Sequence, residues 1–179
     1  MFAIRLATAE DLPALQELIP LSARELSRGF YSPEQIESAI RFVFGPDSRL
    51  IADRTYFVAE TDGKLVACGG WSRRRTLYGG DQMKAEADPP LDPRTDAARI
   101  RAFFVHPAFA RRGLAAAILR ACMDAARRAG FRRIELAATL PGVPLYEAFG
   151  FEARERLEAP LPNGVLLPIL RMERGLDEG

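Results

Sequence analysis

The sequence is poor in the residues that build disulfide frameworks and metal sites. Its 179 residues include two cysteines, Cys68 and Cys122, and a single histidine, His106. Two cysteines so far apart make neither a disulfide framework nor a zinc-binding pattern, and one histidine cannot build a histidine-rich site. Cys122 falls on the apolar side of a helical pattern, which predicts a buried free thiol rather than a nucleophile. We therefore expect no metal and no thiol chemistry.

Long apolar runs and a strong charge imbalance are also missing. No stretch reaches the roughly 18 apolar residues that a membrane-spanning helix needs, and residues 1–6 do not begin a signal peptide. The formal net charge of +1 argues against a general nucleic-acid binder. These absences predict a soluble cytoplasmic protein of a reducing compartment, with no nucleic-acid or membrane partner. With 48% hydrophobic residues, residues 1–179 can bury the core of a single domain.

Apolar periodicity and turn signals predict the element order β-α-α-β-β-β-α-β-α-β-β. Helices are expected after cap residues at Thr8 and Ser32, and over residues 112–129 and 143–149. Strands are expected over residues 2–6, 55–59, 65–71, 100–105, 134–138, 151–157 and 165–172, and a loop over residues 79–96. Residues 100–138 form one β-α-β unit with a parallel strand pair, and the other neighbours are hairpins. The expected fold is α+β (α/β), with a mixed sheet and helices on both faces.

The most informative segment is the corner between residues 100–105 and the following helix. Arg111, Arg112 and Gly113 lie at the start of that helix, where free N–H groups and the helix dipole favour an anion. Between residues 99 and 133 there are nine arginines and one acid, Asp124. The outward arginines of the helix are expected to be solvated, but cations at a helix start are disfavoured unless an anion lies nearby. This corner is therefore expected to hold a phosphate or diphosphate.

Three motifs at consistent spacing resemble one family. Ala110-Arg111-Arg112-Gly113-Leu114-Ala115 is similar to its Gln/Arg-x-x-Gly-x-Gly/Ala loop, with Ala110 departing from the pattern. Residues 145–151 look like its Phe-Tyr-x-x-x-Gly-Phe segment, with Leu145 in place of the first Phe, and the strand carrying Phe103 and Val105 is the third motif. Over essentially its whole length, the chain resembles the GNAT superfamily of acyl-CoA-dependent N-acyltransferases. The resemblance implies a mostly antiparallel sheet of six to seven strands and an acyl-CoA cleft between two splayed parallel strands.

The resemblance also implies roles for individual residues. Acetyl-CoA would be the co-substrate, and its diphosphate would be held chiefly by main-chain N–H groups. The candidate cofactor-binding residues are Phe103, Val105, Arg111, Arg112, Gly113, Leu114, Ala115, Ala116 and Thr139. The N–H of Val105 is the candidate donor to the thioester carbonyl, and Tyr146 is the candidate general acid for the departing thiolate. The structural alternative for Tyr146 is a half-buried aromatic whose hydroxyl meets solvent.

No general base is predicted. Some family members carry a glutamate at about the position of Arg99, so that base is missing here. The other candidates are Glu60, Glu135 and the acids Asp81, Glu86, Asp88, Asp92 and Asp96. Strand alternation favours a direction away from the cleft for Glu135. His106 precedes a proline at a strand end, which favours a turn-capping role, and a water chain is a further alternative.

The segment Gly69-Gly70-Trp71 leaves two interpretations open. Paired glycines in a strand indicate a bulge or the close approach of a ligand. Trp71 is either a wall of the acceptor pocket or a core residue. For the arginines at 73–75 we favour a solvated position over contact with an acceptor carboxylate.

The leading functional hypothesis is an N-acetyltransferase that acts on a primary amine of a small molecule, with a homodimer as a further expectation. The alternatives are a non-catalytic acyl-CoA-binding module and a protein N-acetyltransferase. A Rossmann-type nucleotide binder is disfavoured, because the Gly-x-Gly-x-x-Gly spacing is absent around Gly113.

Overall fold

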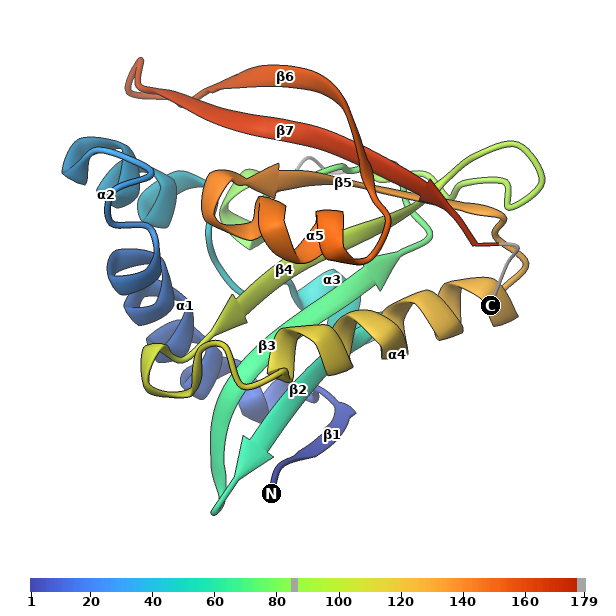
Figure 1. The fold of residues 1–179 in the computed structure, drawn as a ribbon, viewed down its shortest axis with the longest axis horizontal. Helices are drawn as coiled ribbons and strands as arrows, with labels where there is room; N and C mark the ends of the chain where they lie inside the picture. The colour runs from blue at the N-terminus through green and yellow to red at the C-terminus, as the bar shows by residue number, and fades with distance from the viewer. Residues whose placement is uncertain (85–86, 177–179) are drawn as a thin grey trace.

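A computed structural model describes residues 1–84 and 87–176, which form one seven-stranded sheet with helices against both faces (Figure 1). The strand order is β1-β2-β3-β4-β5-β7-β6. The strands are β1 (Ala3–Leu6), β2 (Tyr56–Thr61), β3 (Lys64–Ser72), β4 (Ala98–Val105), β5 (Arg133–Thr139), β6 (Glu152–Pro160) and β7 (Leu166–Gly175). The α-helices are α1 (Leu12–Leu26), α2 (Pro33–Phe42), α3 (Ser48–Ala52), α4 (Leu114–Arg128) and α5 (Val143–Ala148). The expected α+β architecture and its mixed sheet are confirmed.

The two central strands separate along their length. Every neighbouring pair in the sheet is antiparallel except β4 and β5, which are parallel. Their pairing is limited to Ala98 with Ile134 and Arg99 with Glu135, although both strands continue for several residues. The predicted splayed parallel pair is therefore present, and it leaves one edge of β4 without a strand partner.

A β-bulge in β4 lies at the same point. Cys68 pairs with Phe104 and Gly70 pairs with Arg101, so three steps along β4 match two along β3. Ala102, inside the bulge, has φ +57°, a left-handed conformation that costs a non-glycine residue roughly 1 kcal/mol. A bulge bends its strand and increases the local twist. This bend turns β4 away from β5.

Two hydrophobic clusters occupy the two faces of the sheet. One contains the buried stripe of α4, including Ile118 and Leu119, together with Tyr146 of α5. The other contains the buried residues of α1 and α2, including Leu15 and Ala39. Figure 1 shows α1 and α2 in blue at the left, and α4 in gold below α5. The predicted placement of helices on both faces is confirmed.

Most of the predicted local signals have the expected geometry. Asp62 and Gly63 both have positive φ, +49° and +74°, as the predicted tight hairpin between β2 and β3 requires. The Ser32 side chain accepts a hydrogen bond from the N–H of Gln35 and caps α2 as expected. Two details differ. Helix α3 had no clear sequence signal, and α4 begins at Leu114 rather than near residue 112, with Gly113 as its cap.

Candidate active site

A cleft that is partly open to solvent lies where β4 and β5 separate. It is lined by residues 100–104 of β4, residues 136, 137 and 139 of β5, Tyr146, residues 43–45 after α2, residues 77–80, and residues 159, 167 and 169 of the β6–β7 hairpin. Ile100, Leu136 and Tyr146 belong to the hydrophobic cluster beside α4. Phe44 and Leu167 belong to the cluster beside α1 and α2. The cleft therefore passes through the sheet and joins its two faces.

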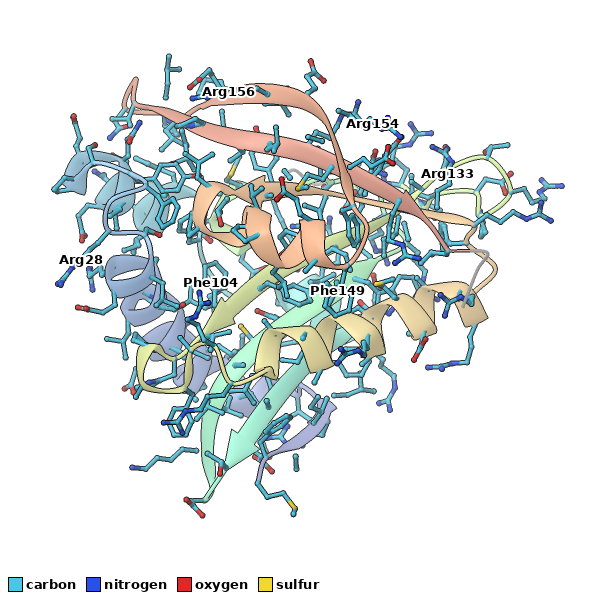
Figure 2. The ribbon with its side chains drawn as sticks, viewed as in Figure 1. Arg28, Phe104, Arg133, Phe149, Arg154 and Arg156 are labelled. Atoms are coloured by element: carbon cyan, nitrogen blue, oxygen red, sulfur yellow. The ribbon has the colours of Figure 1, made fainter. Side chains whose placement is uncertain are left out.

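Aromatic side chains mark these two faces beside the cleft. Figure 2 shows Phe104 toward α1 and Phe149 between α5 and α4. Phe104 packs edge-to-face on Phe44, with ring centroids 5.5 Å apart, and Arg120 covers the Phe149 ring at 5.1 Å. Arg120 is exposed, as expected for the outward arginines of this helix, and its guanidinium makes a cation–π contact on the α4 side.

Tyr146 is a titratable side chain of the cleft lining that belongs to the cluster beside α4. It is 7% exposed, and its ring makes edge-to-face contacts with Phe103 and Phe151 at centroid distances of 6.3 and 5.7 Å. Among the described residues, no protein group is hydrogen-bonded to its hydroxyl, although the side chain lines the cleft. Burial raises the pKa of the Tyr146 phenol, and the nearby Cys122 thiol adds to this shift. The phenol therefore stays protonated at neutral pH.

Gly69 makes room for the Phe103 ring. A Cβ at position 69 would lie 2.7 Å from that ring, a distance that requires movement of the ring or the strand. A Cβ at Gly70 would lie 2.8 Å from the carbonyl oxygen of Thr55. Both glycines are thus explained by close packing within the protein, and the predicted irregularity of the strand is the bulge beside them.

The main-chain groups of Val105 face the free edge of β4. The N–H of His106 donates to Val66 of β3 at 2.8 Å, so by antiparallel alternation the N–H of Val105 points the other way, toward β5. This N–H donates to Ser22 Oγ of α1 at 3.2 Å. The role of Val105 as donor to the thioester carbonyl therefore stays a prediction, and its N–H would have to leave the buried Ser22 hydroxyl to serve a ligand.

Phe103 offers the unpaired main-chain groups instead. It lies two residues before Val105 and so presents its N–H to the same edge of the strand. Phe103 is in register with no residue of β3 or β5, because the bulge and the splayed strands interrupt both pairings. The sequence could not show which of the two N–H groups is free, since the choice depends on a helix more than eighty positions away in the chain.

The corner before α4 has the expected form of an anion site. Arg111 and Gly113 both have positive φ, +61° and +82°, and a Cβ at Gly113 would meet no atom within 4 Å. In the described part of the chain, the N–H groups of residues 111–116 have no protein acceptor. Successive free N–H groups at a left-handed turn and a helix start form a concave site for phosphate oxygens. This geometry fits a diphosphate group.

The side chains of this corner divide into two kinds. Arg111 and Arg112 are exposed, and the Arg112 guanidinium lies 5.2 Å from the centroid of the Phe109 ring. Leu114 is buried in the core beside α4, so any contact it makes with a ligand there comes from its main chain. Thr139 lies apart from this corner, on the cleft wall that also includes Tyr146.

A buried ion-pair network forms the cleft wall on the side of α2. The Arg101 side chain, in a residue only 3% exposed, donates to Asp47 Oδ2 at 3.0 Å and to the carbonyl of Thr76 at 3.1 Å. It also donates to the carbonyl of Gly79, and Lys84 pairs with the same Asp47 carboxylate. Burial lowers the pKa of Arg101, and the Asp47 carboxylate opposes that shift. The network holds the segment after β3 against the cleft.

Sequence reasoning missed this network. Arg101 lies within an apolar strand pattern, and a charged residue there was the available signal for a buried partner. The partner, Asp47, caps α3 by accepting from the N–H groups of Arg49 and Leu50, both at 3.1 Å. Because α3 itself was not predicted, nothing in the sequence placed Asp47 next to Arg101.

None of the proposed base residues in the described ranges lines the cleft. The acids are occupied elsewhere: Glu60 pairs with Arg5, Asp81 with Lys84, Asp88 with Arg49 and Asp92 with Arg94, while Asp96 accepts from the N–H of Asp92. Glu135 binds Arg99 and Arg171. Glu86 lies outside the described residues. His106 Nδ1 accepts from the N–H of Ala108 at 3.1 Å, which confirms its turn-capping role.

Trp71 and the arginines that follow it lie away from the cleft. Trp71 is buried and packs edge-to-face on Phe131 at 6.1 Å, so the core interpretation holds and the acceptor-wall interpretation is wrong. Arg73 lies over the Trp71 ring, and Arg74 forms a bidentate ion pair with the Asp53 carboxylate, with N–O distances of 2.7 and 2.8 Å. The favoured solvated position holds for Arg73 and Arg75, which are exposed, and is wrong for Arg74, which is half-buried because it pairs with Asp53.

Residues 1–84 and 87–176 contain neither a membrane-spanning helix nor a cluster of metal-ligating side chains. No helix there has the length and apolar character needed to cross a membrane. No group of three or more His, Cys, Asp or Glu side chains is arranged to hold a metal ion. Both cysteines are free and buried, as expected for Cys122, and burial raises the pKa of the Cys68 thiol to about 12.

The sequence matches one family model, described as the acetyltransferase (GNAT) family, over residues 18–151. The chain belongs to the GNAT family. The match covers the bulged strand, the corner before α4 and the segment that carries Tyr146. Family membership makes this GNAT chain an acetyltransferase with acetyl-CoA as co-substrate, as the resemblance implied. Among curated proteins, no sequence matches it.

Solved structures of similar fold agree with this assignment. A GCN5-related N-acetyltransferase from Rhodopseudomonas palustris is 20% identical, with a TM-score of 0.71 over 97% of this chain and 94% of the other. The PaiA N-acetyltransferase from Thermoplasma acidophilum, in complex with coenzyme A, is 17% identical, with a TM-score of 0.66 over 98% and 99%. YncA from Salmonella typhimurium, a putative acetyltransferase with acetyl-CoA, is 18% identical, with a TM-score of 0.64 over 99% and 95%. At these identities the likeness shows the fold alone.

Proposed function

We propose that this GNAT chain transfers the acetyl group of acetyl-CoA to a primary amine of a small molecule, with Tyr146 as the general acid. One observation carries the proposal. The unpaired main chain of Phe103 and the unpartnered hydroxyl of Tyr146 line one cleft, and their rings are in edge-to-face contact. Acyl transfer requires a donor to the thioester carbonyl oxygen and an acid that protonates the departing sulfur.

The residues of the corner before α4 fit the diphosphate of the co-substrate. The N–H groups of residues 111–116 are free to donate to phosphate oxygens, and Gly113 leaves open space in front of them. The exposed Arg111 and Arg112 add positive charge at the same place. The free edge of β4, from Phe103 to Val105, leads from this corner into the cleft and would hold the extended arm as a strand partner.

The N–H of Phe103 is the proposed donor to the thioester carbonyl, in place of Val105. Bound acetyl-CoA supplies an activated acetyl group: the amine nitrogen bonds to the thioester carbon, the carbon–sulfur bond breaks, and sulfur leaves with the electron pair. Tyr146 gives its proton to that sulfur, and its raised pKa keeps the phenol protonated in the resting enzyme. The proton lost from nitrogen returns the phenolate to its starting form.

Turnover tests this function. Purified protein is incubated with acetyl-CoA and a broad panel of primary amines, thiol release is followed, and mass spectrometry identifies the N-acetyl product. Thiol release that depends on an amine supports the proposal. Binding of coenzyme A without thiol release across the panel would favour the non-catalytic module. Acetylation of peptide N-termini alone would favour a protein N-acetyltransferase.

A further inference from the structure

The acceptor half of the cleft is apolar. It lies on the side of α1 and α2, opposite the corner that fits the diphosphate, so it remains for the amine. Its wall is made by Val43 and Phe44 after α2, by Leu77 and Tyr78 of the segment after β3, and by Leu167 and Ile169 of β7. All six are hydrophobic or aromatic, and all except Leu77 belong to or pack against the cluster on the α1 and α2 face of the sheet.

Among the described residues, Arg101 is the one charged side chain in the cleft lining. Its guanidinium is already bound by the Asp47 carboxylate and by the carbonyls of Thr76 and Gly79. Asp47 is 1% exposed and also binds Lys84, so its negative charge is satisfied away from the cleft. The lining thus presents no free carboxylate to an ammonium group.

The elements packed around the cleft add no base. On β5, Glu135 is two residues from Ala137 of the lining, and Arg99 and Arg171 occupy both of its oxygens. On β6, Glu158 is exposed, and it pairs in register with Pro168 of β7. Behind the bulge, the Tyr56 hydroxyl and the Cys68 thiol lie 3.4 and 3.5 Å from the Ala102 carbonyl. Their burial raises both pKa values, so both groups stay protonated.

The remaining titratable groups are phenols. Tyr31, on the α2 side, donates to the carbonyl of Pro168 at 2.6 Å and accepts from the N–H of Leu140 at 3.0 Å. Burial raises the pKa of Tyr31 to about 12. Tyr146 is assigned above to proton donation, and Tyr78 is part of the lining. Carboxylate and imidazole, the usual bases near neutral pH, are thus missing from the described lining.

We propose that the acceptor is an amine with an apolar body of aryl or branched-alkyl type, and that the cleft admits it as the neutral free base. This inference rests on the proposed function and adds the substrate class and its protonation state. An ammonium group that entered this apolar wall would lose its hydration without gaining a counter-charge, so the ammonium proton passes to bulk water before binding. The bound amine then needs no side chain to activate it.

The pH dependence of kcat/KM tests the protonation state. The probes are 2-phenylethylamine and its 2,2-difluoro analogue, which have nearly the same shape while fluorine lowers the amine pKa. The rate is expected to rise about tenfold per pH unit below the pKa of each amine, since that is the rise in its free-base fraction. The midpoint should move with the amine. One midpoint shared by both amines would reveal a base on the protein and overturn the proposal.

The acceptor class is tested with a series of unbranched alkylamines against spermidine, at a pH where the free-base fractions are matched. Each added methylene that is buried should raise kcat/KM by about fourfold. A preference for spermidine, with thiol release intact, would overturn this inference and leave the acetyltransferase proposal standing. Absence of thiol release with every amine would instead contradict the proposed function itself.

A matched pair of variants places the acceptor in this half of the cleft. Leu77 is half-buried on the cleft wall, in a segment outside the helices and strands, so it tolerates a polar side chain. Leu77→Glu introduces a carboxylate, and Leu77→Gln is its neutral control. The ratio of kcat/KM for butane-1,4-diamine to that for butylamine is expected to rise at least about tenfold in the Glu variant relative to the Gln variant. Equal ratios would show that the amine binds elsewhere.

Discussion

The buried pair of Asp47 and Arg101 makes a specific prediction about stability. Asp47→Asn keeps the size of the side chain and the oxygen that caps α3, but it removes the negative charge. The Arg101 guanidinium, 3% exposed, then remains buried without a counter-charge. Loss of one partner from a buried ion pair costs roughly 3–5 kcal/mol. For a chain of this size that corresponds to a fall in Tm of about 6–20 °C.

Thermal unfolding followed by circular dichroism measures this fall, and Asp53→Asn is the control. Asp53 also binds an arginine, Arg74, but this pair is partly exposed, with 14% and 33% of the two side chains accessible. Solvent screening limits such a pair to about 1 kcal/mol or less. If the two variants lost similar stability, the Asp47 pair would be as well solvated as the Asp53 pair, and the argument for a buried network would be refuted.

The same variant has an expected functional effect. Arg101 holds the carbonyls of Thr76 and Gly79, and residues 77–80 form part of the cleft wall. Weakening this network should loosen the wall on the acceptor side and leave the corner at Gly113 unchanged. We expect KM for the amine to rise while the Kd for coenzyme A stays the same.

Three other changes have defined outcomes. Gly113→Val should abolish binding of coenzyme A in a calorimetric titration. Gly164→Val is the matched control, with φ +86° and equally open space, and should bind coenzyme A normally. Equal affinities of the two variants would place the ligand elsewhere. Gly69→Ala should cost about 1–3 kcal/mol and lower kcat, because its Cβ would lie 2.7 Å from the Phe103 ring; denaturant unfolding and steady-state rates check this, and a neutral result would contradict the packing argument. Arg5 donates to the Asp11 carboxylate and holds its pKa below the usual range. The stability that this pair contributes is therefore present above the unfolded pKa of about 4 and is lost as pH falls through the folded pKa. Asp11→Asn should therefore flatten the loss of stability in acid, and an unchanged pH profile would exclude the pair as its cause.

Local signals in the sequence were sufficient for most of the elements. The cap at Ser32 and the turn at Asp62 and Gly63 each act over a few residues, so their geometry follows from the local chain. The short helix α3 escaped prediction because its five residues have too few positions to show a period.

The details of the site depend on contacts between distant segments. The bulge in β4 arises from a register difference with β3, and the occupied N–H of Val105 depends on Ser22 in α1. Local propensity carries no information about either. The role of Gly69 likewise follows from a ring on the neighbouring strand, the Phe103 ring, and not from a ligand. The motif around Tyr146 was visible in sequence because its residues are contiguous.

The most direct measurement of the central claim is kcat for Tyr146→Phe at saturating acetyl-CoA, with the best amine of the panel. Phenylalanine keeps the ring that contacts Phe103 and Phe151, and the missing hydroxyl had no protein partner among the described residues, so Tm and the Kd for coenzyme A should stay unchanged. We expect kcat to fall by about 100- to 10,000-fold, as for loss of a general acid. A kcat close to that of the parent protein would show that the phenol of Tyr146 takes no part in proton transfer.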